Sequence, residues 1–327
     1  RRSGRGAYSE DVLILAGDVS ESMPRLESTL RSFRGVFKHV FFTPGNHELW
    51  TRRAGFEGSS VEKLRAIFAM CRRLGVHYTP QRLQGGLWIV PMLSWHHQEF
   101  DCEPDITGWE GIPRVELCMA DYRACDWPAP LTQKDCSVAR FMDGMNDTAL
   151  LEYLELQPHE GCASFCNWAQ LLERIGECRE HGEVVISFSH FVPHIELNPE
   201  KRFLFFPNLN KAVGSNFLQA RVEALAPDMH IFGHTHFGWD ATIGKTRFVQ
   251  AALSYPQERK SRWPSIAIGE LETRPVQIFD GENFVEELPC RWSDFYKRTA
   301  RNPSDTENLA PYVASMYRRA KRQGTSS

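Results

Sequence analysis

Four polar clusters in this sequence each come directly after a short hydrophobic run, and this repeated placement restricts the folds that the chain can adopt. The clusters are Gly17-Asp18 after VLILA, Gly45-Asn46-His47-Glu48 after VFKHVFF and a Thr-Pro pair, Ser189-His190 after VVISF, and Gly233-His234-Thr235-His236 after MHIF. Hydrophobic runs without alternation are typical of strands that are buried on both faces of an α/β sheet. Because the carboxyl ends of neighbouring strands in such a sheet face one crevice, the clusters can converge although they lie far apart in sequence.

Helical spacing of apolar residues separates the expected strands. Met23, Leu26, Leu30 and Phe33 recur at this spacing between the first two hydrophobic runs, which predicts a strand–helix–strand unit. Further strands are expected at 87–93, 184–189, 229–232, 247–253 and 265–269, and further helices at about 60–74, 168–178 and 217–225. The alternation of strands and helices predicts an α/β fold.

One long stretch departs from this alternation. Residues 98–165 are rich in Pro, Gly, Asp and Trp and have only short periodic pieces, so we interpret them as an insertion after the strand at 87–93. Polar and basic residues dominate after about residue 290, which predicts a peripheral helix and a basic tail over 291–327. The sequence therefore predicts one α/β domain over residues 1–290 that carries a loop-rich insertion.

Charge, hydropathy and cysteine placement exclude several classes of protein. The formal net charge is −3, so the protein lacks the overall positive charge that would favour binding to nucleic acid. No uninterrupted apolar run approaches the roughly 20 residues that a membrane-spanning helix needs. The nine cysteines are scattered without a CxxC pair, which suits neither a zinc ribbon nor a disulfide-stapled module. We therefore expect free thiols at the cysteines between 102 and 136, no membrane insertion, and a reducing, cytoplasmic location.

The polar clusters supply a mixed set of oxygen and nitrogen ligands. Asp18 offers a carboxylate, Asn46 offers an amide oxygen, and His190, His234 and His236 offer imidazoles. Such a set is typical of sites for Mn, Fe or Zn rather than Ca. Each residue also has an ordinary alternative, since an Asp after a strand often occupies a turn and a lone His is often solvated. The joint occurrence of the five residues favours a metal site over these alternatives.

The same motifs resemble those of the calcineurin-like metallophosphoesterase family, which run D-x-H, G-D, G-N-H-[D/E], a lone His and G-H-x-H. All of these except the first occur here in the family's order, spread over residues 17–236. The resemblance implies a sandwich of two facing sheets flanked by helices. It also implies metal-dependent hydrolysis of a phosphate ester or phosphoanhydride, with two divalent transition metal ions (Mn, Fe or Zn) and a hydroxide that bridges them.

The resemblance further implies a role for each motif residue. Asp18 would bridge the two metals, Asn46, His190 and His234 would complete the second site, and His236 would belong to the first. His47 would not bind metal. It would lie beside the leaving group as a proton donor or transition-state stabiliser.

The first motif of the family, D-x-H, is missing before Asp18, since residues 1–17 contain no His. The D-x-H at 228–230 lies on the strand before GHTH, where alternation turns its side chains to a face rather than to the strand end, so we reject it as the missing motif. Because the chain opens with Arg1 rather than Met, we expect the motif and its strand to lie upstream. On this interpretation the chain is an N-terminally truncated domain, an incomplete metalloenzyme that binds less metal than the longer form.

The resemblance also narrows the substrate. Protein Ser/Thr phosphatases of this family carry GDxxDRG and RGNHE, with arginines that grip the phosphate, but this sequence reads GDVSESM and PGNHE. We therefore expect a phosphorylated small molecule or a nucleotide as substrate. His96 and His97 follow the strand at 87–93 and can line the same crevice, where they would contact substrate. The equal alternative is that they are two exposed histidines in a loop.

Two other functions stay open from the sequence. One is a nuclease, against which the near-neutral charge and the lack of a basic, aromatic-rich stretch argue weakly. The other is a non-catalytic scaffold that keeps the fold and binds proteins with its surface. An upstream D-x-H strand would favour an enzyme, and its true absence would favour the scaffold.

Overall fold

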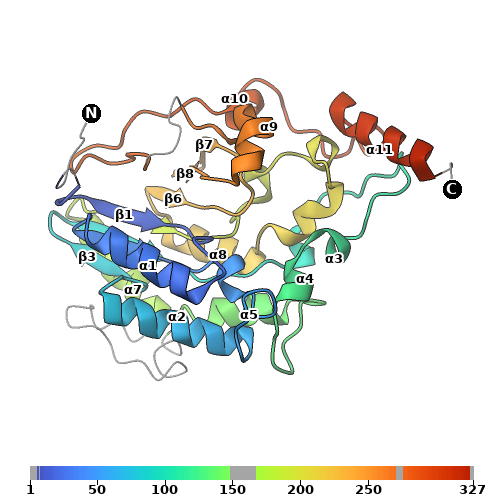
Figure 1. The fold of residues 1–327 in the computed structure, drawn as a ribbon. Coiled ribbons are helices and arrows are strands. Elements are labelled where there is room, and N and C mark those ends of the chain that lie inside the picture. The colour runs from blue at the N-terminus through green and yellow to red at the C-terminus, as the bar shows by residue number, and fades with distance from the viewer. Residues whose placement is uncertain (1–5, 7, 148–166, 270–274, 325–327) are drawn as a thin grey trace.

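Two sheets and the helices outside them make up the fold, so the expected sandwich of two facing sheets is confirmed (Figure 1). The computed structural model describes residue 6 and residues 8–147, 167–269 and 275–324. In the smaller sheet, β1 (Val12–Leu15) pairs in parallel with β2 (His39–Phe42).

The larger sheet has the strand order β3-β4-β5-β6-β8-β7. Its central strands β4, β5, β6 and β8 run parallel, whereas the edge strands β3 and β7 run antiparallel to their neighbours. The strands are β3 (Gln81–Leu83), β4 (Leu87–Pro91), β5 (Val184–Phe188), β6 (Met229–Ile231), β7 (Trp239–Ile243) and β8 (Thr246–Gln250). Because the parallel strands end at the same edge, the loops that follow them are neighbours.

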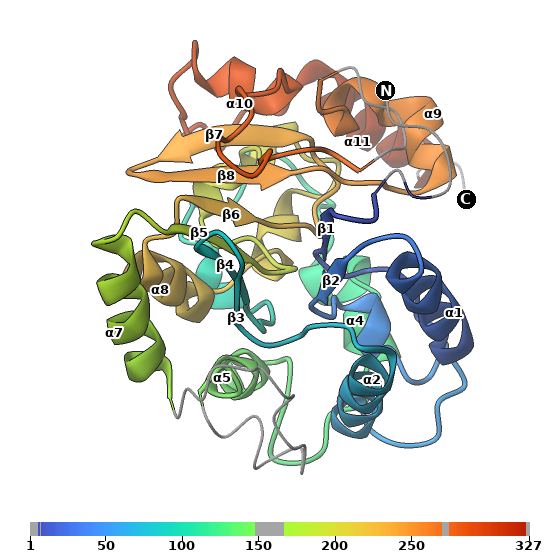
Figure 2. The same cartoon turned by 90° about the vertical axis from the view of Figure 1, so that its left-hand side faces the viewer.

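Helices cover the outer sides of both sheets (Figure 2). The helices α1 (Met23–Arg34) and α2 (Ser60–Leu74) lie beside the small sheet, and α7 (Trp168–Arg179) and α8 (Asn216–Leu225) lie beside the large one. The remaining helices are α3 (Val115–Cys118), α4 (Asp121–Ala124), α5 (Ser137–Gly144), α9 (Pro256–Ile266), α10 (Arg291–Tyr296) and α11 (Pro311–Gly324).

The inner faces of the sheets share one buried hydrophobic cluster. Phe41 of β2 lies in this cluster with Ile186 of β5 and Met229 of β6. Val40 and Phe42, the neighbours of Phe41, belong instead to a second cluster that includes residues of the helices. This division follows from strand alternation, and each fully buried side chain of this size contributes about 1.5–3 kcal/mol.

The expected helices at 60–74, 168–178 and 217–225 are confirmed to within one residue. The strand expected at 265–269 is wrong, because Ser265 and Ile266 end α9 and residues 267–269 form no strand, with only a β-bridge at Ile268. A helix start overrides the apolar run there: Pro256 occupies the first helical position, and Glu258 accepts from the backbone N–H of Tyr255.

We expected an insertion at residues 98–165. The structure describes residues 98–147 of this segment, which contain α3, α4 and α5, and residues 148–165 lie outside the described residues. This segment contacts the C-terminal region, since the indole N–H of Trp109 donates to the carbonyl of Glu307 at 3.0 Å. Val313 of α11 is fully buried in the cluster formed there. The division at residue 290 stays a prediction.

The structure also bears on the expectations of free thiols and of no membrane insertion. The free thiols expected between residues 102 and 136 are found at Cys102, Cys118, Cys125 and Cys136, and in the described part of the chain Cys71, Cys178 and Cys290 are free as well. The cytoplasmic location stays a prediction. Among the helices of the described ranges, none combines the length and the hydropathy needed to cross a membrane.

Candidate metal centre

Two glycines let the loops after β1 and β2 approach each other closely. Gly17 has a φ of 78°, and a Cβ built on it would lie 2.5 Å from Nδ1 of His190. A Cβ built on Gly45 would overlap Oδ1 of Asp18. A larger residue at either position would therefore push the motif side chains apart.

Three of the predicted ligands themselves have left-handed backbone. The φ angles are 56° for Asp18, 72° for His234 and 57° for His236. Residues with a Cβ rarely adopt this conformation, and such strain concentrates at functional sites.

Side chains from the ends of four strands meet at one point. Nε2 of His190 lies 3.4 Å from Oδ2 of Asp18 and 3.0 Å from Oδ1 of Asn46. Nδ1 of His234 lies 3.1 Å from the same Asn46 oxygen and 3.2 Å from Nε2 of His190. The structure thus brings together Asp18, Asn46, His190 and His234, four of the residues that the sequence nominates as ligands. We call these four residues the ligand cluster.

The two histidines of the ligand cluster point lone pairs rather than protons at each other. Nδ1 of His190 lies 2.8 Å from the carbonyl oxygen of Ala16, and Nε2 of His234 lies 2.9 Å from that of Ala212. Because a carbonyl oxygen only accepts, the proton of each neutral ring belongs on the nitrogen that faces the carbonyl. Burial lowers the pKa of His190 to about 4 and the pKa of His234 well below its usual value, so both rings are neutral near pH 7.

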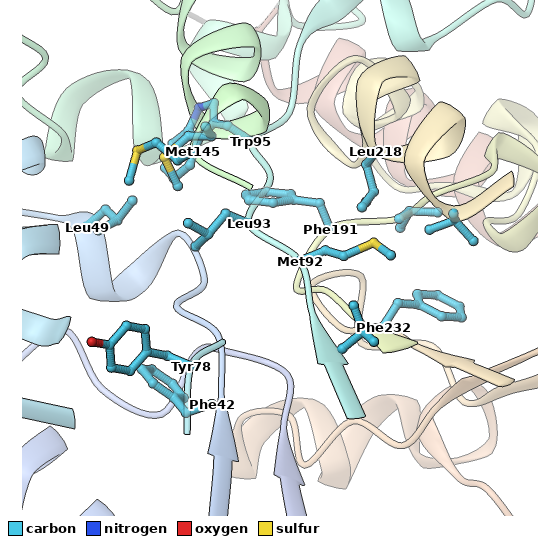
Figure 3. Packing of buried hydrophobic residues seen from close by; sticks show 14 of the residues in the cluster. Phe42, Leu49, Tyr78, Met92, Leu93, Trp95, Met145, Phe191, Leu218 and Phe232 are labelled. Atoms are coloured by element: carbon cyan, nitrogen blue, oxygen red, sulfur yellow. The ribbon is translucent and has the colours of Figure 1, made fainter. Parts of the chain in front are cut away.

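Aromatic side chains form the floor beneath these histidines. The ring of Phe191 lies 4.9 Å from that of His190 and 4.7 Å from that of His234, measured between centroids. Trp95 packs edge-on against Phe191 at 5.3 Å, within the buried cluster drawn in Figure 3. This apolar floor keeps water from one side of the histidines, which is the physical source of their lowered pKa values.

The ligand cluster fits a divalent metal ion. Its facing atoms are a carboxylate oxygen, an amide oxygen and two imidazole lone pairs, all of which accept and none of which donates. Acceptors gathered in a buried place are costly unless a cation satisfies them. Oxygen and imidazole donors together are typical ligands of transition metal ions.

Glu48 holds the loops that carry two of the ligands. Its Oε2 accepts from the backbone N–H groups of Asp18 and Gly45, each at 2.8 Å, and its Oε1 accepts from that of Ser20 at 2.8 Å. Burial and the charge of Asp18 raise the pKa of Glu48 to about 7. This fully buried side chain therefore sets the spacing between the β1 and β2 loops.

His47 lies beside the ligand cluster at the start of a short 3₁₀ turn, His47–Leu49. Its Nε2 is 3.9 Å from Oδ2 of Asp18 and 2.9 Å from the hydroxyl of Tyr255. The ring lies over that of Trp50 with 3.7 Å between centroids, and 21% of the side chain is exposed. Burial lowers the pKa of His47, and the charge of Asp18 opposes this shift. An imidazole in this position can exchange a proton with a bound substrate.

His236 lies apart from the tightest acceptor group. In the described residues that group is Asp18, His190 and His234, whose ligand atoms all lie within 4.8 Å of one another. Nδ1 of His236 instead lies 2.6 Å from Oε2 of Glu258. A carboxylate on one ring nitrogen is a common way to orient the other nitrogen toward a metal. The first metal site implied for Asp18 and His236 stays a prediction.

His96 and His97 are interior residues, each 3% exposed, so the alternative of two exposed loop histidines does not describe them. Nε2 of His96 lies 3.2 Å from Oδ2 of Asp121. Nδ1 of His97 lies 3.0 Å from Glu99, and its Nε2 accepts from the backbone N–H of Asn216 at 3.1 Å. These bonds hold both rings in the protein interior, and substrate contact by either stays a prediction.

The rejection of the D-x-H at 228–230 agrees with the structure. Both ring nitrogens of His230 are bonded within the sheet, at 2.8 Å from the hydroxyl of Ser187 and 2.9 Å from that of Ser189. Asp228 accepts from the backbone N–H of Val185 at 2.8 Å. Neither side chain is directed to the ligand cluster.

Sequence reasoning missed Trp50, Asp121, Tyr255 and Glu258, all of which touch a motif residue. Glu258 and Tyr255 stand at a helix start around Pro256, a signal that was present in the sequence but overlooked. Asp121 lies in the segment 98–165, where no spacing marks it. Burial raises the pKa of Asp121, but bonds and charges from His96, His234 and Asn46 outweigh burial and hold it below the usual range.

Comparisons with known proteins bear on the same motifs. The sequence model of the family described as calcineurin-like phosphoesterase matches residues 2–238. A curated relative, the [acyl-carrier-protein] phosphodiesterase PptH of Mycobacterium tuberculosis, is 25% identical over 270 residues, which are 78% of this chain and 72% of the relative. The crystal structure of the phosphopantetheinyl hydrolase PptH of that organism aligns with 80% of this chain and 85% of its own, at 22% identity and a TM-score of 0.48.

Proposed function

The chain belongs to the calcineurin-like phosphoesterase family, whose members are metal-dependent phosphoric ester hydrolases, and on this premise we propose that it cleaves a phosphodiester at a binuclear metal centre. The observation that carries the proposal is the ligand cluster, in which four acceptor atoms face one another without a donor. One divalent ion held by the ligand cluster and a second held by Asp18 and His236 would lower the pKa of a water to supply a nucleophile, and would neutralise the phosphoryl oxygens during in-line displacement.

The proposed ligands are divided between the two ions. We assign Asp18 to both ions and His236 to the first. Asn46, His190 and His234 complete the second site. The neutral state of the two buried imidazoles supports the assignment, because a ring must offer a lone pair to bind a metal.

We assign the leaving-group proton to His47. An alkoxide leaves a phosphodiester slowly unless it is protonated, and His47 is the partly exposed imidazole beside Asp18. The Tyr255 hydroxyl, 2.9 Å from Nε2 of His47, orients that nitrogen. The carboxylate of Asp18, 3.9 Å from Nε2 of His47, opposes burial, which is the larger effect and lowers the pKa of this imidazole.

For the substrate we propose a phosphodiester attached to a protein, in place of the free small molecule or nucleotide expected from sequence. The support is the relative from M. tuberculosis, whose name states that it acts on a phosphodiester of an acyl-carrier protein. Its similarity spans 78% of this chain and 72% of the relative.

A substrate panel tests the proposal. The protein is incubated with Mn²⁺ and acyl-carrier protein that bears its phosphodiester-linked group, bis(p-nitrophenyl) phosphate, p-nitrophenyl phosphate, or single-stranded RNA. We expect cleavage of the two non-nucleic diesters, and a loss of that cleavage in His190→Ala but not in His181→Ala, which removes an exposed imidazole beyond α7. Cleavage of RNA alone would establish the nuclease, and no cleavage of any substrate would favour the scaffold.

A further inference from the structure

Asp121 brings a carboxylate from the segment 98–165 to the edge of the ligand cluster. It begins α4 and is fully buried. Its Oδ1 accepts from Nδ2 of Asn46 at 2.8 Å and from the indole N–H of Trp50 at 2.7 Å. Its Oδ2 faces Nε2 of His96 at 3.2 Å. Three groups from outside α4 therefore converge on one side chain.

The bond to Asn46 decides which way its amide faces. A carboxylate only accepts, so the NH₂ end of the Asn46 side chain must face Asp121. The amide oxygen then faces His190 and His234, at 3.0 and 3.1 Å. A flipped amide would set oxygen against the carboxylate and N–H groups against a metal ion, and both contacts are repulsive.

The bond to Trp50 connects the same carboxylate to His47. Trp50 is 5% exposed, and its ring supports that of His47 at 3.7 Å. The indole N–H has one direction in which to donate, so its bond to Asp121 fixes the plane on which His47 rests.

His96 completes the arrangement from the other side. Its Nδ1 has no hydrogen-bond partner among the described residues, so in the neutral ring the proton is best placed on Nε2, where it donates to Asp121. This donor role gives the buried His96 a function through Asp121 that needs no contact with substrate.

We propose that Asp121 is a positioning residue that orients the metal ligand Asn46 and Trp50, the support of His47, so that α4, within the described residues 98–147, is a working part of the active site. The inference rests on the proposed function, because it gives Asn46 a metal to bind. It adds a residue that acts on both the metal and the proton donor through two separate hydrogen bonds.

Two substitutions of Asp121 separate positioning from simple packing. Asp121→Leu removes both acceptors, and we expect Mn²⁺ affinity, measured by calorimetry, to fall about 10–100-fold, the usual effect of losing a group that orients a ligand. Asp121→Asn keeps an acceptor for Asn46 and Trp50, while His96 can move its proton to the free Nδ1. We expect Asp121→Asn to recover most of the affinity and the visible spectrum of the Co²⁺-loaded protein.

Two further variants complete the experiment. Asp126→Asn is the matched control, because Asp126 lies in the same segment but pairs with Arg52 at the surface; its Mn²⁺ affinity should equal that of the wild type. Trp50→Phe keeps an aromatic ring beside His47 but removes the five-membered ring with its N–H donor, so it should leave Mn²⁺ affinity unchanged and lower kcat for a diester with a poor leaving group roughly tenfold.

The outcomes distinguish this inference from the proposed function. Wild-type Mn²⁺ affinity in a folded Asp121→Leu, or an equal loss in Asp121→Asn and Asp121→Leu, overturns the positioning role while leaving the hydrolase intact. If Asp121→Leu does not fold, Trp50→Phe decides, and wild-type kcat in that variant overturns the inference. A wild-type protein that binds no Mn²⁺ and cleaves no diester overturns both.

Discussion

Nε2 of His190 and Nδ1 of His234 lie 3.2 Å apart, each as a lone pair, because each ring donates its other N–H to a backbone carbonyl. Two unprotonated nitrogens this close, with the oxygen of Asn46 between them, do not stabilise each other. A cation changes the same arrangement from repulsive to attractive. This relationship between two histidines that are 44 residues apart underlies the account of the site.

Asn46 and His47 are adjacent in sequence, yet Asn46 faces His190 and His234 whereas His47 lies over Trp50, and we propose different roles for them. Asn46→Ala should lower metal content and kcat together, because its oxygen belongs to the ligand cluster. His47→Ala should keep its metal and lower kcat by roughly 10²–10⁴, the usual contribution of a positioned acid. Metal analysis beside kcat on good and poor leaving groups checks the division. Loss of metal in His47→Ala, or an equal slowing of both substrates, would refute the leaving-group role.

Tyr255 should matter to catalysis through its hydroxyl alone. Tyr255→Phe keeps the ring and removes the group that lies 2.9 Å from Nε2 of His47, so we expect kcat to fall about 3–10-fold with the metal retained. Tyr312→Phe is the control, since its hydroxyl donates to the carbonyl of Phe203 and the side chain is similarly exposed. Equal kcat in both variants would remove Tyr255 from the mechanism.

Glu48 should contribute to stability more than to chemistry. Glu48→Gln places an NH₂ group against a backbone donor in a fully buried position, which should lower the free energy of unfolding by about 1–3 kcal/mol. Urea denaturation of the metal-free protein measures the change. Glu57→Gln, at an exposed position, is the control and should have no effect. Unchanged stability in Glu48→Gln would show that the three backbone bonds are not needed.

His230 should make the metal-free protein sensitive to acid. Burial lowers its pKa to about 3, so below the ordinary value of 6.5 the unfolded chain binds a proton that the folded chain does not. The free energy of unfolding should therefore fall between about pH 6.5 and 3, by up to about 1.4 kcal/mol per pH unit for this group. Glu48, with its pKa raised to about 7, acts in the opposite direction between pH 7 and 4.5.

Comparison with a variant isolates the contribution of His230 from that of Glu48. His230→Gln cannot titrate, so its free energy of unfolding should depend less on pH than that of the wild type over the same range. Denaturation curves at a series of pH values give both dependences. Parallel curves for the two proteins would show that His230 does not titrate differently in the folded and unfolded states.

Much of the scaffold could be predicted because its signals are local. The runs at β1, β2, β5 and β6 are mostly apolar, and the helices α2, α7 and α8 carry regular apolar stripes. The strand expected at 265–269 was wrong because the apolar residues there end a helix that Pro256 and Glu258 begin. The helix-start signals at Pro256 and Glu258 therefore favour a helix over a strand for the apolar residues that follow them.

The contacts around the ligands could not be predicted, because they join segments with no fixed spacing. Asp121 meets Asn46 across 75 residues, and Tyr255 meets His47 across 208. The motif residues could be nominated since each follows a buried strand, but their neighbours depend on tertiary packing. The burial of His96 and His97 was missed for the same reason.

Diester hydrolysis as a function of added metal tests the central claim most directly. The protein is freed of metal with a chelator, and cleavage of bis(p-nitrophenyl) phosphate is followed as Mn²⁺ is restored in steps. The account predicts no cleavage without metal and full recovery on addition, with His190→Ala requiring much more Mn²⁺ because it removes one of the facing lone pairs. Undiminished cleavage by the wild-type protein in excess chelator would contradict it.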